Sequence, residues 1–393
     1  MITVDTALSN LFDLVSPLQH ETVSLRTAAG RILARDVAAT RTQPPFDAAS
    51  MDGYALKSIE ADVHAQFKVV GEAAAGHAWH GTVGAGQAVR IFTGAPVPKG
   101  ADRVIIQENV TRSGDLITIS EAGDTKTNIR PAGIDFAAGG VMSGPRRLTP
   151  GDIALLASMN IADVPVVRRP NVALISTGDE LVMPGETPGP DQIIASNTFG
   201  LAALLEHAGA HARILPIARD TVASLQTVLG LVDGADLIVT IGGASVGDHD
   251  LVAQAASEMG LDQSFYKVAM RPGKPLMAGR LGDVPMVGLP GNPVSAMVCG
   301  TVFLTPMLRA MMGLGAAPAP RVTRTLAARL AENGPREHYM RAIVDGDTIR
   351  DAGDQDSSLL SVLSDANALL IRPPHDPART AGDTVDAILL QQS

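Results

Sequence analysis

The sequence has little of what several classes of protein require. Its 393 residues include a single cysteine, Cys299, which excludes a disulfide framework and a cysteine-rich zinc site and is typical of a buried residue in a reducing compartment. Lysine and arginine number 31 against 41 aspartates and glutamates, so the net charge is −10. Because nucleic-acid binding needs a basic surface, a nucleic-acid partner is not expected.

Signals for export and for membrane insertion are also lacking. The N-terminal residues MITVDTALSN have neither a basic start nor an apolar core, so no signal peptide is expected. Residues 284–308 carry no charge, but Pro290-Gly-Asn-Pro293 divides this run into pieces that we expect to be too short to span a bilayer. The sequence therefore predicts a cytoplasmic protein with no membrane partner.

Apolar residues and glycine are abundant. Hydrophobic residues make up 46% of the sequence and glycines number 39, which is typical of a globular α/β protein with many loops. The chain is too long for one compact core, so two to four domains are expected.

Two patterns alternate in the first 170 residues. Helical spacing of apolar residues within 1–43 and 141–170, including a short helix over 27–34, predicts a discontinuous N-terminal α+β linking domain. Between these segments, residues 44–140 contain short β-like runs separated by glycine-rich turns. This texture predicts a β-rich domain inserted into the first one.

Strands and helices alternate regularly from residue 171 to residue 315. Such a series predicts a three-layer α/β domain whose mostly parallel sheet is covered on both faces. After an Ala/Pro linker at 316–320, residues 321–393 are again rich in β-like runs and predict a C-terminal domain of β-barrel type. The expected fold class is therefore multidomain α/β.

The most informative stretch runs from Asp236 to Asp250. A buried strand at 237–241 is followed by Gly242-Gly243, and then by a hydroxyl, a further glycine and two carboxylates; these are Ser245, Gly247, Asp248 and Asp250. Glycines let the backbone approach a ligand, and the start of the next helix favours an anion. Carboxylates oppose a bare anion, so they indicate a cation beside it, most plausibly Mg²⁺.

Two further loops at predicted strand ends have similar chemistry. One is Ser176–Glu180, and the other is Leu289–Pro293, where an asparagine precedes a helix whose free N–H groups could hold an anion. Each loop alone could be an ordinary strand-to-helix turn. Together at the carboxyl edge of one sheet, they predict a phosphate-plus-magnesium site. Five carboxylates could supply the one or two that Mg²⁺ needs, the others being caps or solvent-facing: Asp179, Glu180, Asp220 (a likely cap of the next helix), Asp248 and Asp250.

Two other segments are candidates for chemistry. Lys267, Arg271 and Lys274 place three cations within eight residues, which suits a polyphosphate or oxyanion, although solvated surface charge is the alternative. In FDAASMDGYAL, Asp52 could be an acid, a base or a metal ligand, or the acceptor in a tight turn. Thr93-Gly94 places a hydroxyl and a glycine at another strand end.

One motif points to a different chemistry. Gly243-Ala-Ser245-Val-Gly247 matches the nucleophile elbow of serine hydrolases, but the available histidines, His338 and His375, lie beyond the linker, so this alternative is weak. The sequence contains no Walker A motif, no complete dinucleotide fingerprint and no HExxH metal site.

Seven segments in order resemble one family. FDAASMDGYA, IFTGAPVPKGADRVI, STGDEL, SNTFGLAALLEHAGA, TIGGASVGDHD, RPGKPLMAG and GLPGNPVSA are similar to the molybdopterin molybdenumtransferases of the MoeA type, which include the gephyrin E-domain. The resemblance implies insertion of molybdate into adenylylated molybdopterin with Mg²⁺-dependent release of AMP. It also implies a four-domain homodimer whose partners include a molybdopterin adenylyltransferase and apo-molybdoenzyme chaperones.

The resemblance carries specific positions onto this chain. The implied catalytic residues are Asp52, Thr93, Asp135, Glu180, Asp220, Asp250, Lys267 and Arg271, of which Glu180, Asp220 and Asp250 form the metal set. Cofactor-binding positions from the motifs and the loops above are Gly242, Gly243, Ser245, Gly247, Lys274, Pro290, Gly291, Asn292, Pro293, Arg341 and Ser357. Arg271 departs from the family, which often has lysine there.

Two further functions use a similar α/β domain. A molybdopterin adenylyltransferase is disfavoured by the flanking domains and the MDGYA segment, and an ATP-consumption assay would identify it. A non-catalytic cofactor-binding or scaffold protein is disfavoured by the carboxylates and cations that this chain retains.

Overall fold

A computed structural model describes residues 1–121, 126–243 and 251–390. The chain forms two compact units. Unit 1 comprises Met1–Glu21, Gly30–Ala34 and Val166–Ser393, and unit 2 comprises Thr22–Ala29 and Arg35–Pro165. This division is coarser than the four domains expected from the sequence, whose boundaries stay a prediction.

Unit 2 is built mainly on a six-stranded sheet with the order β8-β5-β7-β6-β10-β9. The strands are β5 (Gly53–Leu56), β6 (Gln66–Ala73), β7 (Gln87–Ile91), β8 (Arg103–Ile106), β9 (Val110–Ser113) and β10 (Leu116–Ile119). Their apolar side chains form two buried clusters. The β-rich texture read from the sequence is thus confirmed.

Shorter elements complete this part of the chain. Helix α2 (Pro150–Ser158) begins with a capping box between Thr149 and Asp152. The helix expected over 27–34 is wrong, because η1 (Leu25–Thr27) is followed by Gly30 at φ +74° and by a buried strand, β2 (Ile32–Leu33). The remaining short strands are β1 (His20–Ser24), β3 (Val37–Ala38), β4 (Ala48–Ala49), β11 (Ile129–Arg130), β12 (Val141–Met142), β13 (Arg146–Arg147) and β14 (Asp163–Val167).

Unit 1 contains the α/β domain, whose six-stranded sheet has the order β18-β15-β19-β23-β22-β20. The strands are β15 (Asn171–Ser176), β18 (His211–Ile214), β19 (Leu237–Ile241), β20 (Leu261–Tyr266), β22 (Met277–Leu281) and β23 (Val284–Leu289). The first four strands in this order run parallel, and β22 runs antiparallel to both of its neighbours, β23 and β20. The expected mostly parallel sheet is confirmed.

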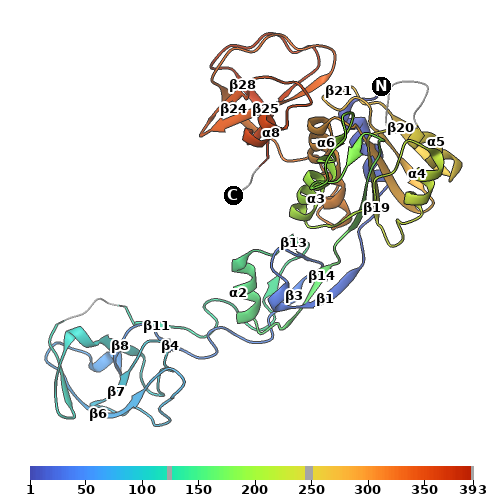
Figure 1. Cartoon of the computed structure of the whole chain (residues 1–393). Coiled ribbons are helices and arrows are strands. Elements are labelled where there is room, and N and C mark those ends of the chain that lie inside the picture. The colour runs from blue at the N-terminus through green and yellow to red at the C-terminus, as the bar shows by residue number, and fades with distance from the viewer. Residues whose placement is uncertain (122–125, 244–250, 391–393) are drawn as a thin grey trace. The chain divides into compact units, whose positions relative to one another are not determined.

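Helices cover both faces of this sheet, with α3 and α6 on one side of β19 and α4 and α5 on the other (Figure 1). Alternate side chains of β15 and β19 enter the two apolar clusters, so both faces are buried. The helices are α1 (Val4–Asp13), α3 (Asn197–Ala208), α4 (Val222–Leu229), α5 (Leu251–Glu258), α6 (Pro293–Cys299) and α7 (Thr305–Met311). The domain is therefore three-layered, as predicted.

A π-helical stretch, η4 (Gly300–Leu304), joins α6 to α7 into one helical run. Within the described residues, Pro293–Met311 is long and apolar enough to cross a membrane, but 72% of its apolar window is buried inside the protein, as in a core helix. The charge-free segment is cut between β23 and α6 as expected, but the second piece is not short, because Pro293 begins the helix and the helical run continues to Met311.

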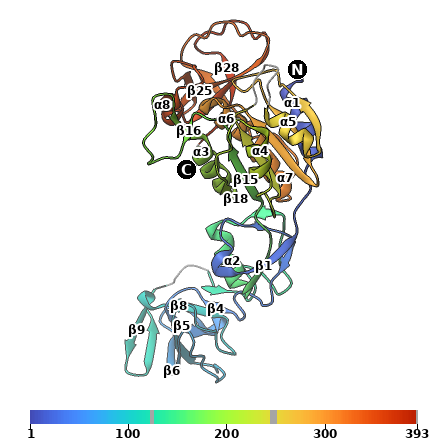
Figure 2. The same cartoon turned by 45° about the vertical axis from the view of Figure 1, so that its right-hand side comes forward.

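The C-terminal residues form a closed five-stranded barrel, drawn in orange and red in Figure 2. Its strands are β24 (Val322–Leu326), β25 (Glu337–Asp345), β26 (Thr348–Asp351), β27 (Ala368–Arg372) and β28 (Thr384–Leu389). The pairing of β25 with β27 closes the barrel, and β21 (Met270–Arg271) adds to β25 in parallel. Helix α8 (Leu360–Asp365) contacts α6. The predicted barrel-like domain is confirmed.

Candidate functional site

The topology of the α/β sheet creates a crevice at one edge. After β15 the chain passes to β18 on one side and then returns to β19 on the other side. Ligands bind outside the carboxyl ends of parallel strands at such a switch point. The loops that begin after Ser176, Ile241 and Leu289 all start at this edge. Three loops that the sequence singled out are thus brought together.

Backbone contacts hold these loops against one another. The Thr177 amide donates to the Ile241 carbonyl over 3.0 Å, and the Gly242 amide donates to the Leu289 carbonyl over 3.1 Å. Gly242 and Gly243 have φ of +94° and +67°. A Cβ at Gly242 would lie 2.7 Å from the Thr177 carbonyl oxygen, and one at Gly243 would lie 2.3 Å from Val252 Cγ2. Both positions therefore require glycine.

A pocket of about 650 Å³, here called the anion pocket, lies between these loops. Eight residues expected from the sequence line it: Glu180, Asp220, Gly242, Gly243, Pro290, Gly291, Asn292 and Pro293. Ser176 and Thr177, from the predicted loop 176–180, also line it, whereas the polar residues Ser196, Asn197 and Ser358 and the adjoining Pro275 line it without having been assigned a role from the sequence. Four expected positions, Ser245, Gly247, Asp248 and Asp250, lie outside the described residues.

Two carboxylates in this pocket are uncommitted. Neither the Glu180 nor the Asp220 side chain makes a hydrogen bond or ion pair with any residue that the structure describes. The expectation that Asp220 caps the next helix was wrong, because the Thr221 hydroxyl accepts from the Ser224 amide instead. Asp179 accepts a hydrogen bond from the Asp220 amide over 3.2 Å.

Arg219 fixes the backbone beside these carboxylates. One terminal nitrogen of its guanidinium donates to the carbonyls of Gly178, Asp179 and Leu181 over 3.4, 3.0 and 3.2 Å. These bonds hold the turn that carries Glu180 without pairing a cation to the carboxylates themselves. Proteins commonly hold Mg²⁺ with one or two carboxylates together with phosphate oxygens of a substrate, so two carboxylates on a fixed backbone are sufficient.

The described residues therefore fit a magnesium ion only when it is shared with a ligand. No group of three or more His, Cys, Asp or Glu side chains suited to a metal occurs among them. Magnesium usually keeps waters and substrate oxygens in its coordination shell, so two carboxylates suffice.

One residue that lines the pocket has a buried hydroxyl without a partner among the described residues. Thr177 is 4% exposed, and its Oγ1 has no hydrogen-bond partner among the described residues. Burying a hydroxyl without a partner costs about 1–3 kcal/mol, so such atoms are rare in folded proteins. Because Thr177 lines the pocket, a polar ligand bound there is a candidate partner for this hydroxyl.

The start of α6 is used differently from the expectation. Asn292 occupies the N-cap position but its side chain makes no capping hydrogen bond. The side-chain amide of Asn292 instead donates to Ser357 Oγ over 3.0 Å. The Val294 amide donates to the Ser357 carbonyl over 3.1 Å. At least one N–H group expected to hold an anion is thus already occupied. The side-chain amide of Asn197, on α3, donates to the Gly291 carbonyl over 2.7 Å and so holds this loop against α3.

Arg341 supports the loop that carries Ser357. Its side chain is 2% exposed and donates to the carbonyls of Asp356 and Asp354 over 2.7 and 3.1 Å and to Gln355 Oε1 over 3.3 Å. Burial lowers the pKa of Arg341, but the guanidinium still holds its charge. These side-chain hydrogen bonds all go to the loop, and Ser358 of that loop lines the anion pocket.

The three expected cations surround a hairpin next to Pro275. The Lys267 amide donates to the Leu276 carbonyl over 2.9 Å, and the Val268 amide donates to the Lys274 carbonyl over 3.0 Å. Lys267 Nζ lies 4.6 Å from the ring centroid of Tyr266. The residues described as lining the anion pocket include Pro275 but none of the three cations.

Arg271 lies beside His338, with which it is paired across β21 and β25. Burial, and then the positive charges of Arg271 and three further arginines, lower the pKa of His338 to about 4. A histidine so easily deprotonated is a weak general base at neutral pH, which counts against its use in a hydrolase triad.

Asp52 and Thr93 meet in unit 2. The pairing of Gly53 with Ile91 across β5 and β7 brings them together. Asp52 Oδ1 accepts from the amide and from the hydroxyl of Thr93, each over 2.7 Å. These two bonds hold the pKa of the Asp52 carboxyl below its usual range. Asp52 thus accepts hydrogen bonds across two strand ends and not within a tight turn of its own, and it is ionised at neutral pH.

Arg90 and Asp135 lie near this pair in the same unit. The Arg90 guanidinium stands 5.2 Å from the Tyr54 ring centroid and 4.6 Å from that of Phe92, and it donates to the Gly53 carbonyl over 3.1 Å. Asp135 lines a pocket of about 440 Å³ that Gly94 also borders. Among the described residues, the expected catalytic positions are therefore divided between the units, with Asp52, Thr93 and Asp135 in unit 2 and the others in unit 1.

Comparison with known proteins gives a consistent result along the chain. Residues 2–160 match the MoeA N-terminal region (domain I and II), residues 173–310 match a probable molybdopterin binding domain, and residues 323–390 match the MoeA C-terminal region (domain IV). These three matches follow the order of segments expected from the sequence.

Whole-length relatives agree. Molybdopterin molybdenumtransferase 2 of Mycobacterium tuberculosis is 38% identical over 378 residues, covering 92% of this chain and 93% of that protein. Molybdopterin molybdenumtransferase of a Nostoc species is 34% identical, covering 98% and 93%. The crystal structure of a MoeA protein from Pyrococcus horikoshii superimposes with a TM-score of 0.85 at 26% identity, covering 99% and 100%. The chain belongs to the MoeA family of molybdopterin molybdenumtransferases.

Proposed function

We propose that this protein inserts molybdate into adenylylated molybdopterin and releases AMP. The relatives named molybdopterin molybdenumtransferase support the reaction class. The observation that carries the proposal for this chain is the anion pocket itself, which is lined by Glu180 and Asp220, by Thr177, whose buried hydroxyl has no partner among the described residues, and by the loop at Gly242 and Gly243 that requires glycine. This combination suits a pyrophosphate held with a divalent cation.

In this proposal each group of residues has a separate task. Gly242 and Gly243 allow the backbone to lie close to the pyrophosphate, and Thr177 Oγ1–H donates to one of its oxygens. Glu180 and Asp220, with Asp250 from outside the described residues, hold Mg²⁺, which when bound neutralises charge on the phosphates. Fixed donors and cations arranged before the reaction stabilise the charge that develops as the phosphoanhydride breaks.

The cations at 267–274 are assigned to the anionic substrates. Lys267 and Lys274 act as point charges, and Arg271 can contact two oxygens of molybdate or of the terminal phosphate at once. In unit 2, Asp52 is kept ionised by Thr93 and is available as a base or as an orienting acceptor. We further propose that the active form is a cytoplasmic homodimer that receives its substrate from a molybdopterin adenylyltransferase and delivers its product to apo-molybdoenzyme chaperones.

The test is a reconstitution. Purified protein is mixed with adenylylated molybdopterin, Mg²⁺ and molybdate, and AMP release is followed together with activation of an apo-molybdoenzyme. Both signals are expected, and both should need molybdate. Binding of the substrate without AMP release would overturn the transferase proposal and leave the protein as a carrier or scaffold.

A further inference from the structure

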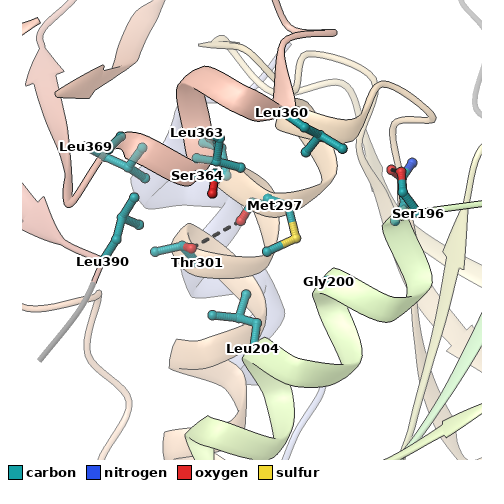
Figure 3. A pocket seen from close by; sticks show the side chains of 13 residues that line it. Ser196, Gly200, Leu204, Met297, Thr301, Leu360, Leu363, Ser364, Leu369 and Leu390 are labelled. Atoms are coloured by element: carbon teal, nitrogen blue, oxygen red, sulfur yellow. Dashed lines mark hydrogen bonds between the residues drawn. The ribbon is translucent and has the colours of Figure 1, made fainter. Parts of the chain in front are cut away.

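A second pocket of about 420 Å³ lies beside the anion pocket and differs from it in chemistry. Figure 3 shows Leu360, Leu363 and Ser364 of α8 above it, and Met297, Thr301 and Leu204 below. None of the described residues that line this apolar pocket carries a charge. Pockets of this size and apolar character are typical of small-molecule sites.

The two pockets adjoin. Ser196 and Asn197 line both of them, and Ser358 in the anion pocket precedes Leu360 in the apolar pocket by two residues. A polar, carboxylate-containing chamber thus continues into an uncharged, apolar one. A ligand that fills both must have an anionic part and an uncharged part close to each other.

The local structure keeps the apolar pocket open. A Cβ at Gly200 would lie 2.9 Å from Met297 Sδ, so the absence of a side chain there lets Met297 lie against α3 instead of entering the pocket. The Thr301 hydroxyl donates a hydrogen bond to the Met297 carbonyl over 3.1 Å, so this hydroxyl does not need a polar partner in the pocket. No residue of α8 is fully buried, so α8 stands over the pocket without filling it.

We propose that the apolar pocket binds the ring end of the substrate, a fused bicyclic nitrogen heterocycle whose phosphate lies in the anion pocket. The inference rests on the proposed function, because adenylylated molybdopterin carries such a ring, adenine or pterin, on each side of its pyrophosphate. Met297 supplies a polarisable thioether for the ring, and leucines supply apolar contact. Ser196 and Ser364 stand at the wall as hydrogen-bonding groups for ring nitrogens.

The test uses the full-length protein and three probes: AMP, free pterin and pyrophosphate, each titrated calorimetrically with Mg²⁺ present. Leu360→Trp places a large ring in the pocket from an exposed position, and Leu155→Trp makes the same change at an equally exposed leucine of α2 in the other unit. We expect Leu360→Trp to lower the affinity for AMP or for pterin at least tenfold and to leave the affinity for pyrophosphate unchanged. Leu155→Trp should change none of the three affinities. If only the affinity for AMP falls, the pocket binds the adenine ring; if only the affinity for pterin falls, it binds the pterin ring.

Unchanged affinity of Leu360→Trp for both ring compounds would overturn the inference, as would a wild-type protein that binds neither of them. Should Leu360→Trp fail to fold by circular dichroism, Gly200→Ala tests the same pocket by pushing Met297 into it, with the same expected losses. Molybdate-dependent AMP release is measured separately. If AMP is released but the pocket variants bind the ring compounds as the wild type does, only this inference is refuted. If the ring compounds bind in the pocket but no AMP is released, only the transferase function is refuted.

Discussion

The unpaired hydroxyl of Thr177 allows a prediction in which stability and binding change in opposite directions. The atom is buried, has no partner among the described residues and lines the anion pocket. Thr177→Val removes the hydroxyl and keeps the branched shape. Since an unsatisfied buried hydroxyl costs about 1–3 kcal/mol, the free energy of unfolding of the ligand-free protein should rise by about 1 kcal/mol.

The same substitution should weaken ligand binding. A hydrogen bond to a charged group contributes about 1.5–3 kcal/mol, so the affinity for Mg²⁺-pyrophosphate should fall about 10-fold to 100-fold. Thr240 provides a matched control, because its hydroxyl on β19 is also buried and unpartnered among the described residues but lies outside the lining of the pocket. Thr240→Val should stabilise the protein similarly and leave pyrophosphate affinity unchanged.

Urea unfolding followed by far-UV circular dichroism measures the stability, because the single tryptophan, Trp79, lies in unit 2 and does not report on unit 1. Calorimetric titration with pyrophosphate measures the affinity. A Thr177→Val protein that is less stable than the wild type would show that the hydroxyl has a partner. Equal pyrophosphate affinity of both variants and the wild type would remove Thr177 from the site.

Three further predictions concern other parts of the site. Thr93→Val removes one of the two bonds that depress the pKa of Asp52, so this pKa should rise, and the acid limb of the pH profile of kcat/KM should move to higher pH; an unmoved limb would remove Asp52 from that ionisation. Glu180→Gln and Asp220→Asn should each raise the Mg²⁺ concentration needed for half-maximal pyrophosphate binding about tenfold, and an unchanged requirement in both would refute the proposed metal set. Arg341→Met removes three hydrogen bonds of a buried guanidinium to partly buried acceptors and should lower the free energy of unfolding by about 2–4 kcal/mol in urea titrations, with Arg341→Lys nearly as low; a loss below 0.5 kcal/mol, on the order of a surface change, would contradict this.

Much of the α/β domain could be predicted from the sequence because its signals are local. The buried strand at 237–241, the glycines after it and the helical spacing from 251 onward follow one another in the chain. The rule for parallel sheets then places strand ends at one edge, so the anion pocket followed from pattern and topology together. Gly242 and Gly243 were recognisable because the positive φ that they adopt excludes most other residues.

Features that depend on distant partners could not be predicted. The segment 27–34 has helical spacing, but Leu33 pairs with Val166 and becomes a strand, because burial against a distant segment overrides a weak local preference. Asp220 and Thr221 are both acceptable caps by composition, and only the backbone geometry shows that Thr221 is used. The lack of a partner at Thr177 cannot be read from any neighbouring residue.

The C-terminal barrel belongs to the site and is not merely attached to the α/β domain. Its loop gives the Ser357 carbonyl to the Val294 amide at the start of α6, places Ser358 in the anion pocket and leads directly to Leu360 in the apolar pocket. Arg341, buried at the base of the loop, holds its backbone. A disturbance at Arg341 should therefore reach both pockets at once, whereas a disturbance at the glycine loops should reach only the anion pocket.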